Sequence, residues 1–212
     1  MMTHDTSTAR AWRGMKRLLA IGLFLIGASL LGGCDRPDPA PKFKLTDVSG
    51  ADFGTALNLT DHNGKPRTLG DFRGKVVVIF FGFTHCPDVC PTALAELAQV
   101  AKELGNDAEK MQVLFVTVDP ERDTPELLRQ YVPSFNPKFL GLYGDAVATA
   151  RAAKEFKIFY QKQPLPGGSY SVDHSAGTYV LDPRGRLRLF AGYGAGAPAL
   201  LHDIRILLQL SS

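Results

Sequence analysis

The stretch VVVIFFGFTHCPDVCP, residues 76–91, decides the fold of this chain. Its first half, Val76–Phe83, is a continuous apolar run rather than an alternating one, which is typical of a strand covered on both faces in an α/β sheet. Its second half carries Cys86 and Cys90 and ends at Pro91, a residue that suits the first turn of a helix. The sequence therefore predicts two thiols at the point where a central strand turns into a helix.

The segments on either side of this stretch predict one α/β domain over residues 51–212. A hairpin is expected over residues 57–69, because Asn63-Gly64 is a strong turn signal between two short strands. Further strands are expected at 113–118, 140–143, 178–181 and 187–190, and helices at 91–105, 124–131, 146–156 and 199–210. Residues 162–171 hold two prolines and two glycines and are expected to form a loop. This order is typical of a thioredoxin-like fold, here with an N-terminal β-hairpin extension.

Residues 1–50 are predicted to form a targeting segment and a tether rather than part of the folded domain. Basic residues precede the apolar stretch Leu18–Leu31, whose 14 residues fall short of the about 20 that span a bilayer, so residues 1–33 are expected to be a signal peptide. Leu31-Gly32-Gly33-Cys34 resembles the bacterial lipobox, which implies lipidation of Cys34; the alternative is an uncleaved anchor with an incidental cysteine. Residues 34–50 hold three prolines and are expected to be an extended tether.

The position of the domain in the cell follows from the same segment. Asp35, directly after the lipobox cysteine, resembles an inner-membrane retention signal of bacterial lipoproteins. We therefore expect a lipid-anchored protein at the periplasmic, extracytoplasmic face of the inner membrane.

The charge of the chain excludes one class of partner. The formal net charge is +3, but residues 1–33 hold four of the 24 Lys and Arg residues and one of the 21 Asp and Glu residues, so the remainder is formally neutral. No cluster of basic residues interleaved with aromatic ones remains in it. Nucleic-acid binding is therefore not expected.

The thiols of the domain are suited to thiolate chemistry. The chain has three cysteines, and lipidation of Cys34 leaves Cys86 and Cys90, which an oxidising compartment allows to pair. A helix N-terminus favours the thiolate, which is both the redox nucleophile and the metal ligand. The spacing is one residue wider than the usual Cys-x-x-Cys redox motif, and it also lets both sulfurs hold one soft metal ion such as Cu(I) or Zn(II). A stabilising disulfide, a redox pair and a metal site all remain open at this point.

A metal site needs a third ligand, and His174 is the candidate. It directly precedes the strand expected at 178–181, and in a thioredoxin-like fold this segment faces the cysteine turn. Thioredoxins place a cis-proline there, whereas this chain has no proline between Pro166 and Pro183. The domain has three other histidines. His62 is expected in a surface turn, and His202 is expected on the last helix. His85, next to Cys86, is expected to point away from the cysteines.

Three segments resemble motifs of the Sco/SenC family of copper proteins: Gly82–Pro91, Val118–Pro125 and Asp173–Ser175. The resemblance runs from about Phe53 to the C-terminus. It implies a thioredoxin-like fold, a copper site at Cys86, Cys90 and His174, and a tethered domain outside the cytoplasm. It also implies a role in assembling the dinuclear copper centre of cytochrome c oxidase.

Copper, as Cu(I), Cu(II) or both, is the metal that the resemblance implies. Two thiolates and one imidazole suit Cu(I), whereas Cu(II) would need a fourth donor such as water or a carboxylate. Asp88 and Asp119 are secondary candidates for that donor or for a partner contact, each with a turn or helix-cap role as the alternative. The expected partners are the copper-centre subunit of the oxidase and other periplasmic copper carriers or thiol reductants.

Two other functions compete with copper delivery. A thiol–disulfide reductase that keeps the copper-ligand cysteines of the oxidase reduced would use the same pair, Cys86 and Cys90, as its redox-active residues. A peroxidase of the peroxiredoxin class would share the fold, but such enzymes carry a Pro-x-x-x-Thr/Ser-x-x-Cys segment that does not precede Cys86. The protein is not expected to be an enzyme of the usual kind beyond possible thiol–disulfide exchange.

Overall fold

The computed structural model describes residues 41–210. The expected signal peptide, Cys34 and the first part of the expected tether lie outside these residues. Within the described part of the chain, no helix has the length and hydropathy needed to cross a membrane.

The core of the domain is a mixed sheet of eight strands. In spatial order they are β1 (Thr46–Asp47), β10 (Leu187–Gly192), β9 (Gly177–Leu181), β4 (Val76–Gly82), β5 (Met111–Thr117), β6 (Leu140–Tyr143), β2 (Asn58–Asp61) and β3 (Pro66–Thr68). The three strands β4, β5 and β6 run parallel, and the other neighbouring pairs are antiparallel. The expected N-terminal hairpin is β2–β3, whose turn contains Gly64 at φ 84°, a conformation that glycine adopts without strain.

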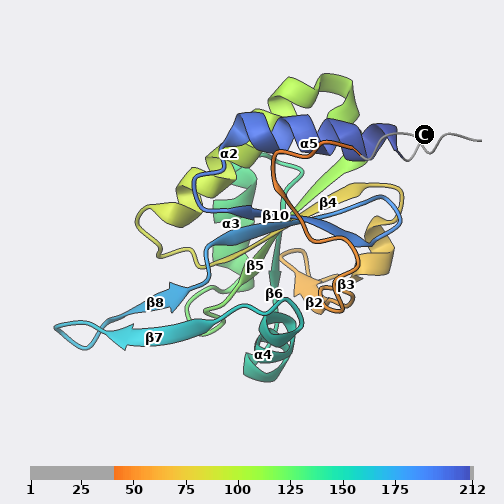
Figure 1. Ribbon diagram of the computed structural model, residues 1–212. Helices are drawn as coiled ribbons and strands as arrows, with labels where there is room; N and C mark the ends of the chain where they lie inside the picture. The colour runs from red at the N-terminus through yellow and green to blue at the C-terminus, as the bar shows by residue number, and fades with distance from the viewer. Residues whose placement is uncertain (1–40, 211–212) are drawn as a thin grey trace, which may run out of the picture. The chain divides into compact units, whose positions relative to one another are not determined.

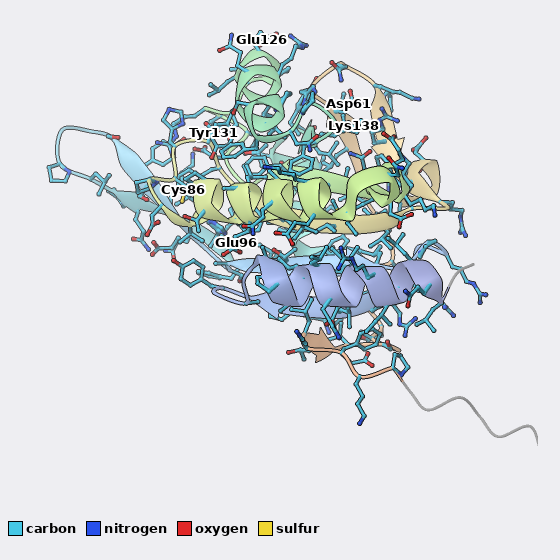
Figure 2. All side chains as sticks on the ribbon, turned by 90° about the horizontal axis from the view of Figure 1, so that it is seen from above. Asp61, Cys86, Glu96, Glu126, Tyr131 and Lys138 are labelled. Atoms are coloured by element: carbon cyan, nitrogen blue, oxygen red, sulfur yellow. The ribbon has the colours of Figure 1, made fainter. Side chains whose placement is uncertain are left out.

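Both faces of the sheet are covered, as the apolar run of β4 predicts. Every residue of β4 is buried. On one face lie α5 (Ala197–Gln209), α2 (Val89–Leu104) and α3 (Pro125–Phe135), side by side in that order in Figure 2. On the other lies α4 (Ala146–Glu155), below the sheet in Figure 1. Successive residues of β4 serve the two faces: Phe80 packs on Phe115, and Phe81 packs on Phe156 at the end of α4.

Two short 3₁₀ helices complete the domain, η1 (Leu69–Phe72) and η2 (Gly105–Lys110). Side-chain caps fix the starts of two α-helices. The Thr124 hydroxyl accepts a hydrogen bond from the Leu127 N–H at α3, and the Asp145 carboxylate accepts one from the Ala148 N–H at α4. These caps satisfy backbone donors that a helix start leaves free.

A second sheet, β7 (Tyr160–Pro164) and β8 (Tyr170–His174), corrects the loop expected over 162–171. This two-stranded hairpin extends away from the central sheet in Figure 1. Its prolines and glycines lie at and beside the turn, which the Leu165 N–H closes by donating to the Ser169 carbonyl over 2.9 Å. The strands on either side are mostly polar, so no apolar alternation marks them in the sequence.

The strand β1 corrects the boundary between tether and domain, which the sequence placed at residue 50. β1 pairs with β10. Just before it, the backbone N–H groups of Lys44 and Leu45 donate to the buried carboxylate of Asp203 on α5. Residues 41–50 therefore belong with the domain, and a strand of two polar residues gives little signal in the sequence.

Candidate metal centre

The two cysteines lie where β4 passes into α2, as the sequence predicts. Cys86 is half-buried in the connecting turn, and its N–H donates to the Phe83 carbonyl over 3.2 Å. Cys90 is the second residue of α2 and is fully buried. The Cys90 N–H donates to the Cys86 sulfur over 3.4 Å. The helix start thus brings the pair together, with one sulfur at the surface and one inside.

Gly82, the last residue of β4, makes the space that Cys90 occupies. A Cβ atom on Gly82 would lie 2.9 Å from the Cys90 Sγ and 2.9 Å from the Phe115 ring. Both distances are shorter than real Cβ contacts, so only glycine fits without movement of its neighbours. The family-like motif therefore contains a glycine for a steric reason, which is close approach to a sulfur.

His174, the last residue of β8, faces the buried cysteine. Its Nε2 lies 3.7 Å from the Cys90 Sγ. Its Nδ1 lies 3.0 Å from the Ser175 carbonyl oxygen, which can only accept a hydrogen bond, so we assign the proton to Nδ1. The rings of Phe80 and Phe83 contact the imidazole in edge-to-face geometry. The lone pair of Nε2 is therefore directed to the side of the ring where the cysteine lies, as a metal-ligating histidine requires.

Burial disfavours the charged form of both groups. It raises the pKa of the Cys90 thiol well above the ordinary value. It lowers the pKa of His174, against the opposing effects of the hydrogen bond to the Ser175 carbonyl and of the Asp173 carboxylate. A cation that replaces the thiol proton removes the cost of a bare buried thiolate, so metal binding here releases a proton.

The three candidate ligands do not form one compact cluster in this structure. Within residues 41–210, no three His, Cys, Asp or Glu side chains are already gathered closely enough to hold a metal ion. The structure brings Cys90 and His174 together, and it places Cys86 against the backbone of Cys90. Of the other histidines, none has a contact with either cysteine among the described interactions.

The structure places those histidines as follows. His62 is 4% exposed rather than in a surface turn, and its Nδ1 accepts the Gly141 N–H, so the expectation of surface exposure is wrong. His85 is half-exposed beside the Asp123 carboxylate, at 3.8 Å. His202, partly exposed on α5, pairs with Asp203 at 2.6 Å. Each of these three histidines has a nearby hydrogen-bond or ion-pair partner that explains the position of its side chain.

Asp123 is a residue of the site that the sequence reasoning missed. It is 1% exposed and accepts hydrogen bonds from the Thr84 N–H, from the Thr84 hydroxyl at 2.5 Å and from the Thr117 hydroxyl at 2.6 Å. Burial raises the pKa of its carboxyl group, and the hydrogen bonds from the two threonines oppose that effect. Asp123 therefore fixes the turn that leads to Cys86. It lies in the second family-like segment, but nothing in the sequence distinguishes it there from Asp119.

Asp119 is fully buried, and each of its two carboxylate oxygens accepts a hydrogen bond from a side chain. It accepts hydrogen bonds from the Arg122 guanidinium at 2.5 Å and from the Tyr170 hydroxyl at 2.8 Å. The guanidinium also lies 3.7 Å from the Tyr170 ring and donates to the Tyr170 carbonyl. We call Asp119, Arg122 and Tyr170 the hairpin clamp, because they join β8 to the loop after β5. Asp88, in contrast, is exposed at the start of α2.

The space above Gly82 gives a first testable prediction. Gly82→Ala is expected to lower the free energy of unfolding by about 1–3 kcal/mol, because the new methyl group overlaps the Cys90 sulfur and the Phe115 ring. Gly192→Ala is the matched control, since nothing lies within 4 Å of a Cβ there and its backbone needs no positive φ. Urea denaturation measures both. Equal stability of Gly82→Ala and wild type would contradict the steric role.

The fold and the site define a thioredoxin-like protein with a thiol pair at the start of its first long helix and a histidine facing the buried thiol. The family model described as SCO1/SenC matches residues 46–209. The chain therefore belongs to the SCO1/SenC family, as the three segments of the sequence suggest.

Individual relatives agree with this membership. The mouse (Mus musculus) protein named Protein SCO2 homolog, mitochondrial, is 40% identical over 152 residues, which are 70% of this chain and 60% of the mouse protein. This chain thus spans about three fifths of that relative's length.

Solved structures of the family have the same fold. Copper-bound ScoI of Bradyrhizobium japonicum is 39% identical, with a TM-score of 0.68 over 74% of this chain and 99% of that one. Apo Sco1 of Thermus thermophilus is 42% identical, with a TM-score of 0.71 over 79% of this chain and 98% of that one. The predicted thioredoxin-like fold is confirmed.

Proposed function

We propose that this protein binds one copper ion through Cys86, Cys90 and His174 and delivers it to the dinuclear copper centre of cytochrome c oxidase. The observation that carries the proposal is the pairing of the Cys90 sulfur with His174 Nε2 at 3.7 Å, while Nδ1 is held by the Ser175 carbonyl. The family membership and the copper-bound structure of Bradyrhizobium japonicum ScoI support it.

The donor set suits copper as cargo. Two sulfurs and one imidazole are soft ligands that favour Cu(I). Three ligands leave the coordination of copper unsaturated. A receiving protein can therefore bind the copper with a ligand of its own before the ligands of the carrier dissociate. Cys86 is half-buried, and Asp88, two residues further along the chain, is exposed at the start of α2. A receiving protein would therefore approach from this end of α2.

Loading and release depend on the state of the cysteines. Binding requires reduced thiols, each of which gives up its proton, so affinity is expected to fall as the pH is lowered. Oxidation to a Cys86–Cys90 disulfide removes two of the three donors. The redox state of the pair would thus decide whether copper is held, and thiol reductants of the same compartment become partners of the protein.

The cellular setting of the proposal rests on the N-terminal segment. Lipidation at Cys34 and a tether would place the domain at the periplasmic face of the inner membrane, where the copper centre of an oxidase is assembled. A protein of Bacillus anthracis described as a SCO1/SenC family lipoprotein is consistent with lipid anchoring.

Copper stoichiometry tests the proposal directly. The purified, reduced protein is expected to bind one Cu(I) per chain, and Cys86→Ser and Cys90→Ser are each expected to lose that binding, because an alcohol is a poor ligand for Cu(I). Competition with a chromophoric Cu(I) chelator measures the affinity. Failure of the wild type to bind, or binding by either serine variant with unchanged affinity, would overturn the site.

A further inference from the structure

The hydroxyl group of Tyr131 on α3 is buried without a hydrogen-bond partner among the residues that the structure describes. Its ring packs on Phe115 and Phe135, with centroids 5.9 and 5.3 Å away. A phenylalanine would make both ring contacts equally well. The hydroxyl is thus the part that needs an explanation, because buried polar groups are rarely left unpaired.

The hydroxyl belongs to the surroundings of the cysteine pair. The Phe115 ring and the Cys90 sulfur border the same space above Gly82, and Tyr131 packs on that ring. Figure 2 shows Tyr131 and Cys86 at the same end of α2. Burial raises the pKa of Tyr131, and negative charge on Cys90 and Cys86 raises it further. The hydroxyl therefore keeps its proton, and in this structure it makes no hydrogen bond to either sulfur.

We propose that Tyr131 is a positioning residue whose hydroxyl donates a hydrogen bond to the Cys90 sulfur when that sulfur is a copper ligand. This inference rests on the proposed function, because the metal-bound state is the one in which the buried sulfur is a thiolate. In this structure the Cys90 sulfur faces His174 Nε2 at 3.7 Å, and the Tyr131 hydroxyl has no hydrogen-bond partner among the described residues.

The proposal predicts a difference between states. A donor stabilises a thiolate strongly, a neutral thiol weakly and a disulfide sulfur hardly at all. Tyr131 should thus favour the metal-bound protein and, to a smaller extent, the reduced protein over the disulfide. It should contribute nothing to folding of the metal-free protein, where its hydroxyl is unpaired.

Tyr131→Phe tests this with three measurements on the whole protein. Cu(I) affinity, measured against a chromophoric chelator, is expected to fall about tenfold. The equilibrium with dithiothreitol, in which one protein disulfide and two dithiothreitol thiols exchange for two protein thiols and oxidised dithiothreitol, is expected to shift about threefold toward the protein disulfide. Urea denaturation of the metal-free reduced protein is expected to show unchanged or greater stability.

Tyr179→Phe is the matched control. Tyr179 is a buried tyrosine whose hydroxyl, unlike that of Tyr131, has a partner: it donates to the Phe156 carbonyl over 2.7 Å on the α4 face of the sheet. Its loss should raise the unfolding constant about fivefold and leave copper affinity and the dithiothreitol equilibrium unchanged.

The outcomes separate this inference from the proposed function. Copper affinity and dithiothreitol equilibrium of Tyr131→Phe within twofold of wild type would overturn it, since the hydroxyl would then have no effect on the Cys90 sulfur. Loss of stability like that of Tyr179→Phe would overturn it too. If the wild type binds no copper, the proposed function fails, and the dithiothreitol equilibrium still decides the role of Tyr131.

Discussion

His174→Ala is expected to weaken Cu(I) binding by at least about 100-fold, because loss of a ligand costs more than loss of the groups that orient it, which already costs 10- to 100-fold. The remaining two sulfurs seldom complete a site alone. The fold should be kept, since the imidazole is only partly buried and lies at the end of β8. The measurement is the chelator competition used for the cysteine variants.

The matched control is His202→Ala, a partly exposed histidine on α5 with no contact to the cysteines among the described interactions. It should bind copper as the wild type does. The pair of variants also separates copper delivery from the reductase alternative, because a reductase needs the two cysteines but not the histidine. A His174→Ala protein that binds copper with full affinity would remove His174 from the site.

Asp123→Ala is expected to lower the free energy of unfolding by about 3 kcal/mol and to weaken copper binding as well. Its removal leaves the Thr84 N–H and two threonine hydroxyls without their acceptor, and each buried unpaired group costs about 1–3 kcal/mol, which relaxation of the loop reduces. The turn to Cys86 loses its support at the same time. Asp145→Ala, which removes an exposed helix cap, should cost about 1 kcal/mol and leave copper binding intact.

The pH dependence of the same variant provides an independent check. Since burial raises the pKa of Asp123, the carboxyl group stays protonated in the folded protein at pH values where it is already ionised in the unfolded chain. The stability contributed by the carboxyl group is fully present below its unfolded pKa and declines as the pH rises through the folded pKa. The stability difference between wild type and Asp123→Ala should thus be larger near pH 4 than near pH 8. A difference that grows with pH would contradict the direction of the shift.

The sequence predicted best what depends on local pattern. The strand Val76–Phe83 was predicted because a continuous apolar run has few other uses, and the helix after it because Pro91 marks a helix start. The hairpin β7–β8 was missed because its polar strands have no apolar face. The position of its segment in a thioredoxin-like fold predicts that His174 faces the cysteines, but the sequence does not predict that His174 lies on a hairpin.

Asp123 shows the limit of such reasoning. From the sequence alone, an aspartate in the segment after a strand predicts only a turn. Its importance comes from Thr84 and Thr117, which lie in two other segments and meet it only in the folded protein. Tyr131 is similar, because a tyrosine with an unpaired hydroxyl and one with a paired hydroxyl give the same signal along a helix.

The separate hydrogen bonding of β7 and β8 has a consequence for how variants of this protein should be judged. His174 belongs to a ribbon that is not part of the eight-stranded sheet, and the hairpin clamp joins that ribbon to the loop after β5. A melting curve reports mainly on the sheet and its helices. Movement of this ribbon alone would therefore leave the melting temperature nearly normal while the imidazole moves away from the cysteines. Thermal stability and competence of the site are separate properties of this protein, and soluble expression alone is no measure of the second.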